Sequence, residues 1–182
     1  MKRKWKLWMI AFVVFVMTDI MMQSNRAEAK KRTFTVSSKT IPCSSSYRQK
    51  PYYNKKTKQY YMINSYMRRL STTGGTLKLK KGTYKIPGTI YVPSNVKIVC
   101  ANGVKIKKTK ATGTKKVKST KFLFQMISEE KASGKQNTGK YAASKNTSIQ
   151  GNGKVIFDMG NVNGATAVSY THLRAHETLS DL

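Results

Sequence analysis

The sequence predicts an all-β fold of very short strands preceded by one amphipathic helix. Two observations support this prediction. In residues 55–70, apolar side chains recur every three to four positions, which is the spacing of one helix face. From residue 77 onward, aliphatic and lysine residues alternate, and Gly, Pro or Asn interrupt the alternation at short intervals. The period changes from helical to strand-like at Gly74-Gly75.

Residues 1–29 have the three-part pattern of a secretory signal peptide. Basic residues gather in positions 2–6, an apolar run covers 7–17, and Ala-Glu-Ala at 27–29 offers small residues for cleavage. An uncleaved membrane anchor is the alternative, but Asp19 interrupts the apolar run and a spanning helix needs about 20 mostly apolar residues. We therefore expect cleavage after residue 29, no stable membrane span, and a secreted extracellular protein that can associate with the cell wall.

Residues 30–53 are polar and predict an extended lead-in to the domain. They contain Cys43, and Cys100 is the other cysteine of the chain. An oxidising extracellular compartment would permit a disulfide between the two. A small buried thiol explains either cysteine as simply, so the sequence leaves the bridge open.

The helix expected over residues 55–70 can be capped by Asn54, and residues 71–75 end it. We interpret its tyrosines as packing residues and prefer this to an aromatic platform for sugars. Its apolar face consists of four residues: Tyr60, Ile63, Met67 and Leu70.

Each strand predicted after the helix has one aliphatic face and one face rich in lysine. Such a series builds a sandwich, a barrel or a solenoid of stacked coils. A segment rich in Lys, Ser and Gly at 107–145 is interpreted as an insertion, interrupted by the apolar run 122–127. The expected strands cover residues 77–79, 83–86, 89–92, 96–100 and 104–107.

The helix and the Gly-Gly-Thr-Leu-Lys-Leu-Lys-Lys-Gly-Thr-Tyr segment at 74–84 together resemble the opening of the pectin-lyase-like β-helix proteins. Residues 90–98, with their Ser-Asn-Val step, are similar to the next turn of that family, and residues 146–158 to a later coil. The resemblance covers about residues 54–160. It implies a truncated right-handed parallel β-helix, with residues 54–167 forming an N-terminal capping helix and the first coils.

Residues 168–182 resemble the conceptual translation of a transposon-based sequencing adapter. We therefore expect a non-native read-through tail and a natural protein that is interrupted after about Ala167. Both histidines, His172 and His176, fall in this tail with Glu177 beside the second. Two histidines four residues apart on a helix can share a metal ion, with the carboxylate as base. In an adapter-derived tail this pattern carries no such meaning.

The family resemblance implies glycoside hydrolases and lyases whose catalytic groups belong to later coils. The hydrolases of this group would use two carboxylates about 6.5–9.5 Å apart in an inverting reaction. The family-like region contains no comparable acidic cluster. Asp158 is expected to serve a turn, Glu129 and Glu130 to be solvated, and residues 151–153 to form a turn in place of a nucleotide loop. We expect no catalytic, cofactor-binding or metal-binding residue in this chain.

The formal net charge of the chain is +28. Residues 30–167 retain 29 basic residues and three acidic ones, a net charge of +26. Such a field attracts extracellular polyanions such as pectin-like polysaccharides, teichoic acids or host glycans. No reader motif for nucleic acid is present, and the oligomeric state stays open.

Two functional hypotheses follow. The chain is the N-terminal part of a secreted polysaccharide-degrading enzyme that resembles polygalacturonases and pectate lyases, and this part is itself inactive. Alternatively, it belongs to a non-catalytic surface β-helix that binds anionic cell-wall or host glycans.

Overall fold

The computed structural model describes residues 31–133, 143–160 and 162–169. The expected signal peptide, both histidines and most of the expected non-native tail lie outside these described residues. The described part consists mostly of strands with few helices, and the strands form three parallel sheets. The expectation of a strand-rich fold is therefore confirmed.

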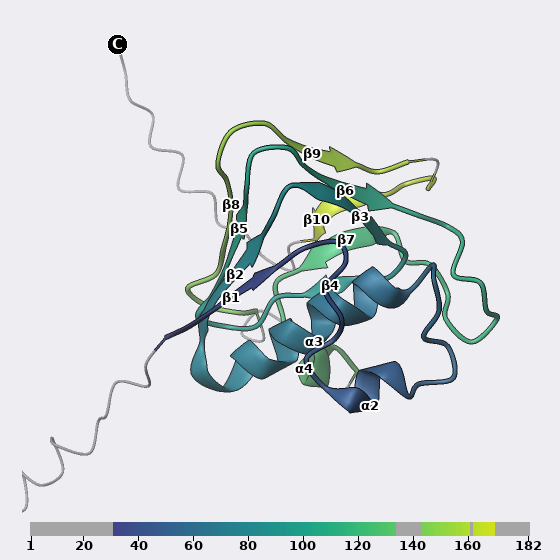
Figure 1. Ribbon diagram of the computed structural model, residues 1–182, viewed down its shortest axis with the longest axis horizontal. Helices are drawn as coiled ribbons and strands as arrows, with labels where there is room; N and C mark the ends of the chain where they lie inside the picture. The colour runs from purple at the N-terminus through teal and green to yellow at the C-terminus, as the bar shows by residue number, and fades with distance from the viewer. Residues whose placement is uncertain (1–30, 134–142, 161, 170–182) are drawn as a thin grey trace, which may run out of the picture. The chain divides into compact units, whose positions relative to one another are not determined.

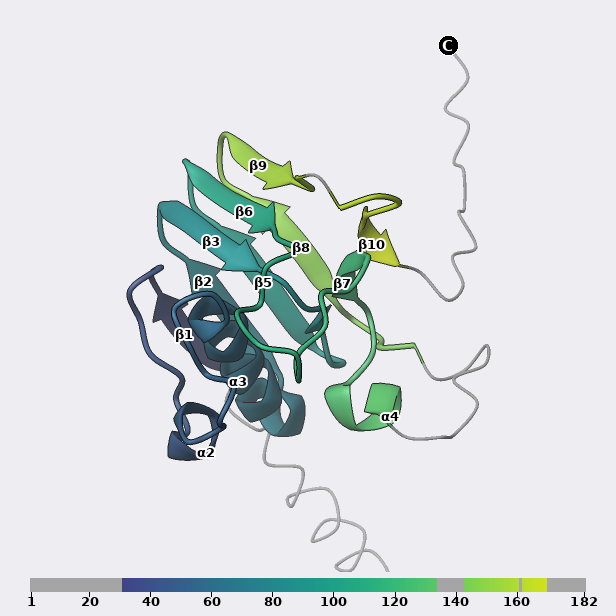
Figure 2. The same cartoon turned by 90° about the vertical axis from the view of Figure 1, so that its right-hand side faces the viewer.

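Every pairing between neighbouring strands in the three sheets is parallel (Figures 1 and 2). Sheet A consists of β1 (Arg32–Val36), β2 (Gly75–Leu79), β5 (Val96–Cys100) and β8 (Ser148–Gly151). Sheet B consists of β3 (Gly82–Ile86), β6 (Val104–Lys108) and β9 (Val155–Asp158). Sheet C consists of β4 (Ile90–Tyr91), β7 (Phe122–Gln125) and β10 (Thr166–Ser169).

The chain visits sheets A, B and C in the same order three times. We call each visit a circuit: β2-β3-β4 is the first, β5-β6-β7 the second and β8-β9-β10 the third. Successive circuits stay in register, so that Leu77 lies opposite Ile98 and Ile98 opposite Ile149. From β2 onward, strands that follow one another in the sequence lie in different sheets, and therefore do not form antiparallel hairpins.

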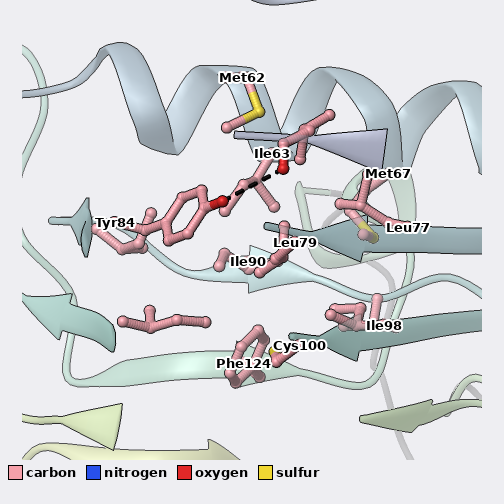
Figure 3. Packing of buried hydrophobic residues seen from close by; sticks show 14 of the residues in the cluster. Met62, Ile63, Met67, Leu77, Leu79, Tyr84, Ile90, Ile98, Cys100 and Phe124 are labelled. Atoms are coloured by element: carbon pink, nitrogen blue, oxygen red, sulfur yellow. Dashed lines mark hydrogen bonds between the residues drawn. The ribbon is translucent and has the colours of Figure 1, made fainter. Parts of the chain in front are cut away.

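One apolar core lies inside the three sheets. Leu77, Tyr84 and Ile90 come from the three different sheets of the first circuit, and each is 0% exposed. Figure 3 shows Ile98 and Cys100 of the second circuit packed in the same cluster. Burial of one such large side chain contributes about 1.5–3 kcal/mol. The aliphatic half of the alternating pattern is therefore what holds the circuits together.

Helix α3 (Lys58–Thr73) packs against the first circuit, with contacts to β2, β3 and β4. Ile63, Met67 and Leu70 of the expected helical face are buried, whereas Tyr60 is half-buried and Met62 is buried in addition. The helix begins later than expected because Asn54 accepts the N–H groups of Lys56 and Thr57 in a turn before it. It also continues through 71–73 and ends at Gly74, whose φ is 66°.

A residue just before the strands of sheet A has a positive φ in successive circuits. Asn95 and Asn146 have φ values of 61° and 54°, a region that asparagine tolerates better than most residues. Asn146 Nδ2 donates a hydrogen bond of 3.0 Å to Asn95 Oδ1. Gly74 precedes them with φ 66°, and a Cβ there would lie 2.9 Å from the Asn95 carbonyl. The stacked asparagines therefore mark the entry into β5 and β8.

Two segments differ from what the sequence predicted. The expected extended lead-in contains β1 and the short helix α2 (Ser45–Arg48). The apolar run inside the expected insertion is β7, a strand of sheet C, and α4 (Glu129–Ser133) follows it. Strand β1 was missed because Phe34 and Val36 are its only apolar residues, and β7 was missed because its apolar run does not alternate with polar residues.

The two cysteines are free, so the disulfide alternative is not realised. Cys100 points into the core and is 0% exposed, and burial raises the pKa of its thiol to about 11. Cys43 lies outside this core cluster, where its Sγ contacts the Ser65 carbonyl of α3 at 3.2 Å. The thiols therefore lie in separate surroundings.

Candidate anion-binding surface

Asp158 ends β9 and has two kinds of partner. Its Oδ1 accepts the N–H of Gly160 at 2.9 Å, which is the turn role assigned from the sequence. Its Oδ2 lies 2.9 Å from Lys105 Nζ and 3.9 Å from Lys107 Nζ. The hydrogen bond from Lys105, followed by that from Gly160, lowers the pKa of this carboxyl. Asp158 is therefore an ionised counter-charge for two lysines of β6.

Glu129 and Glu130 begin α4 and line a shallow hollow beside α3. Glu129 is half-buried and accepts a hydrogen bond of 3.1 Å from the Tyr47 hydroxyl. Burial and, after it, the charge of Glu129 raise the pKa of Tyr47 to about 12. Glu130 is exposed and lies 3.8 Å from Arg68 Nε. Each carboxylate of the described part thus has a structural contact, whereas cleavage of a glycosidic bond requires two carboxyls that flank the substrate.

Within the described residues, no group of three or more His, Cys, Asp or Glu side chains is placed to hold a metal ion. The pair His172 and His176 lies outside this part of the chain. Residues 151–153 lie at the end of β8 and in the turn after it, where Asn102 Oδ1 accepts the Lys154 N–H at 2.9 Å.

The outer face of sheet B carries lysines in adjacent strands. Parallel register aligns Lys85 of β3 with Lys107 of β6 and then with Asp158. The neighbouring row aligns Thr83 with Lys105. Neighbouring strands lie about 4.8 Å apart, so Lys85 and Lys107 are held closer than random surface lysines would be.

Sheet A contributes two more lysines. Lys78 and Lys97 project from β2 and β5, between the buried residues of those strands. The turn from β2 to β3 adds the exposed Lys80 and Lys81. We define the lysine surface as the lysines of these four strands that do not face the core: Lys78, Lys85, Lys97, Lys105 and Lys107.

The charge balance of the described part makes this surface strongly cationic. It holds 26 Lys and Arg residues against three acidic residues. Of those three, Asp158 is the one that forms ion pairs with the lysine surface. Because these side chains face solvent, each contact with a bound anion is worth about 1 kcal/mol or less, and binding depends on many contacts together.

Lys108 differs from every lysine of this surface. It is the last residue of β6, faces the core and is 1% exposed. Its Nζ donates to the carbonyls of Gly88 (2.6 Å) and Phe122 (2.7 Å) and to Thr120 Oγ1 (3.0 Å). Burial lowers the pKa of this amine to about 7. Lys108 therefore joins the segments that enter β4 and β7.

The alternation along β6 already indicates that Lys108 faces the core, although this was not predicted from the sequence. Val104 and Ile106 face the core, and Lys108 is the next residue but one, so it lies on the same side of the strand. An alternating strand places it inside, although lysine is rarely buried without partners. The predicted strand stopped at residue 107 and so missed it.

No known protein family, no curated protein and no solved structure matches this chain. Among the helices of the described residues, none is both long enough and apolar enough to cross a membrane.

Proposed function

We propose that residues 31–169 are the capped N-terminal end of a right-handed parallel β-helix in a secreted protein that acts on acidic polysaccharide. The observation that carries this proposal is the threefold passage through the same parallel sheets, in register and with α3 against the first circuit. The right hand is proposed because crossovers between parallel strands of one sheet almost always have it.

The role of this part is to bind the polymer. An acidic polysaccharide presents carboxylates at regular intervals along an extended chain. The lysine surface presents one pair of cations in register on neighbouring strands, Lys85 and Lys107, together with the single lysines of the other rows. Several weak contacts along one polymer add up, because each later contact forms at high effective concentration. The same field also speeds the encounter with the polymer.

In the first candidate function, residues 31–169 belong to a polysaccharide-degrading enzyme, and residues outside this part perform the cleavage. The second candidate is a non-catalytic surface protein that adheres to anionic glycans. One observation favours it: Glu129, Glu130 and Asp158 all have structural contacts with Tyr47 or basic side chains.

Binding of the purified protein to polygalacturonate, measured by isothermal titration calorimetry at several salt concentrations, tests the proposal. The triple variant Lys78→Gln/Lys85→Gln/Lys107→Gln is compared with Lys55→Gln/Lys56→Gln/Lys58→Gln, which removes the same charge from exposed positions near the start of α3. We expect the first variant to weaken binding about tenfold and the second much less, with binding that declines as salt rises.

Equal weakening by the two triple variants would reduce the effect to overall charge and contradict a defined surface. Neutral dextran is the polymer control and should not bind. Release of reducing ends from polygalacturonate would show that this chain cleaves it, and would overturn the assignment of a binding role alone.

A further inference from the structure

Lys50 holds its ammonium group against tyrosine rings. The residue lies in the segment that connects α2 to α3, and these two helices contact each other (Figure 1). Its Nζ lies 4.9 Å from the ring centre of Tyr47, 5.6 Å from that of Tyr61 and 6.0 Å from that of Tyr52. A cation within about 6 Å of a ring centre is attracted to the electron-rich face of the ring. We call these three rings the tyrosine cage.

The tyrosine cage is held together by contacts that do not involve Lys50. Tyr61 belongs to α3 and is 6% exposed, and its ring centre lies 6.1 Å from that of Tyr47 and 5.7 Å from that of Tyr52. Tyr47 belongs to α2, and its hydroxyl donates a hydrogen bond of 3.1 Å to Glu129. Because the rings pack on one another and on the two helices, removal of the Lys50 side chain should leave them in place.

The tyrosine cage attracts the charge of Lys50 but does not accept its N–H groups. A lysine ammonium has three N–H donors. Among the described residues, no oxygen accepts a hydrogen bond from Lys50 Nζ and no carboxylate lies within ion-pair distance of it. Lys108 shows the contrast, since its Nζ donates to three oxygen atoms. The chemistry of the cage therefore fits a cation that has no N–H donors better than it fits its present occupant.

We propose that the tyrosine cage binds a quaternary ammonium group of the choline type in place of Lys50. Such a group carries a full positive charge, has no N–H donor to satisfy, and presents methyl groups to the ring faces. Glu129, which is bonded to the Tyr47 hydroxyl, adds negative charge next to the cage. Lys50 is half-buried and has no protein hydrogen bond at its ammonium, so its side chain can move into solvent and make room.

Lys50 acts as a competitor that belongs to the protein itself. Because it is attached beside the tyrosine cage, it competes with a free ligand at high effective concentration. The wild-type protein therefore binds a quaternary ammonium ligand weakly, and removal of the Lys50 side chain strengthens binding. A cage that served only to hold Lys50 would show no such gain.

Titration of the full chain with choline and with ethanolamine, followed by NMR, tests the proposal. The two probes have the same charge and differ in the three methyl groups, and about 0.3 M salt screens their repulsion by the cationic protein. We expect Lys50→Ala to bind choline with a Kd on the order of 10 mM, at least about fivefold more tightly than the wild type and than it binds ethanolamine. Lys58→Ala removes the same charge from an exposed position and should bind choline as the wild type does. Equal binding of the two probes by Lys50→Ala, or no binding of choline, would overturn the proposal.

A matched pair of ring variants, made in the Lys50→Ala protein, locates the bound choline. Tyr52 and Tyr53 are both half-buried and both pack against Tyr61, at 5.7 and 6.3 Å between ring centres, but only Tyr52 belongs to the tyrosine cage. We expect Tyr52→Leu to weaken choline binding at least about threefold and Tyr53→Leu to change it little, with circular dichroism to check that both remain folded. Equal losses would place choline elsewhere and contradict the proposal. Lys50 lies outside the lysine surface and polygalacturonate plays no part in this assay, so its outcome is independent of the proposed binding function.

Discussion

The main-chain N–H of Lys85 donates a 2.6 Å hydrogen bond to Oε1 of Gln59, a residue of α3 that lies 26 positions earlier in the chain. The other end of the same carboxamide donates to the Thr83 carbonyl at 3.2 Å. Residues 83 and 85 point their main-chain groups to the same edge of β3, as parallel strands require. One side-chain amide thereby replaces the strand that would otherwise pair with β3.

Replacing Gln59 by leucine should destabilise the protein. The variant leaves the Thr83 carbonyl and the Lys85 N–H without this partner, at a cost of about 1–2 kcal/mol. The Gln59→Glu variant retains the acceptor for Lys85 but turns a carboxylate oxygen toward the Thr83 and Ser38 carbonyls that the amide bonds, so it should be destabilised as well. Urea unfolding followed by circular dichroism measures both. A leucine variant as stable as the wild type would contradict the capping role.

Lys108 should make stability rise with pH. Burial lowers its pKa from 10.5 to about 7, so between these values the unfolded chain holds a proton that the folded protein has released. The free energy of unfolding then increases with pH, by at most about 1.4 kcal/mol per pH unit. Urea titrations from pH 7 to about 8.5, where cysteines and tyrosines are still largely protonated, measure this slope.

The Lys108→Met variant is the control for that slope. It should lose this pH dependence, and it should be less stable by about 1–3 kcal/mol because the carbonyls of Gly88 and Phe122 lose their donor. The variant Lys107→Met changes an exposed neighbour on the same strand and should retain the slope. An unchanged slope in Lys108→Met would refute the assignment.

Tyr84 should limit stability at alkaline pH. Burial raises the pKa of its hydroxyl from 10.0 to about 12, and the hydroxyl donates to the Lys80 carbonyl at 2.7 Å. The unfolded chain loses this proton first, so the contribution is complete below pH 10 and is lost as pH rises through the folded pKa. Tyr84→Phe should cost about 1 kcal/mol at neutral pH and make the alkaline decline less steep. Unfolding curves between pH 9 and 12 distinguish the two proteins.

Asp158→Asn should strengthen binding of acidic polymers. The substitution removes the carboxylate that neutralises Lys105 and Lys107, so both ammonium groups become available to an anion. We expect an affinity gain below about fivefold, since exposed ion pairs are worth less than about 1 kcal/mol. Calorimetry with polygalacturonate measures the gain. Weaker binding would place the polymer on another face of the protein.

Local sequence was sufficient for much of the fold. The alternation of aliphatic residues with lysine in β2 and β5 predicted which side chains are buried, because successive residues of a strand point to opposite faces. The spacing of Ile63, Met67 and Leu70 predicted the buried side of α3. Its bounds were less accurate, since the turn around Asn54 delays the first helical residue.

The lysine surface was predictable only in part. The sequence indicated excess positive charge and lysines on the outward face of each strand. It did not determine that Lys85 lies beside Lys107, because that proximity depends on the register between β3 and β6. The ion pair of Asp158 with two lysines depends in the same way on the pairing of β6 with β9.

The sequence by itself determined where the strands of residues 75–108 lie and which of their residues are apolar, since these properties depend on neighbours within a few positions. Tertiary structure decided which strands pair, that β1 and β7 join the sheets, and that Lys108 is buried while Lys107 is exposed. The physical reason is that main-chain hydrogen bonds between strands carry no side-chain identity. Only the packing of complete circuits around one core selects the partners and supplies the three oxygen atoms that Lys108 requires.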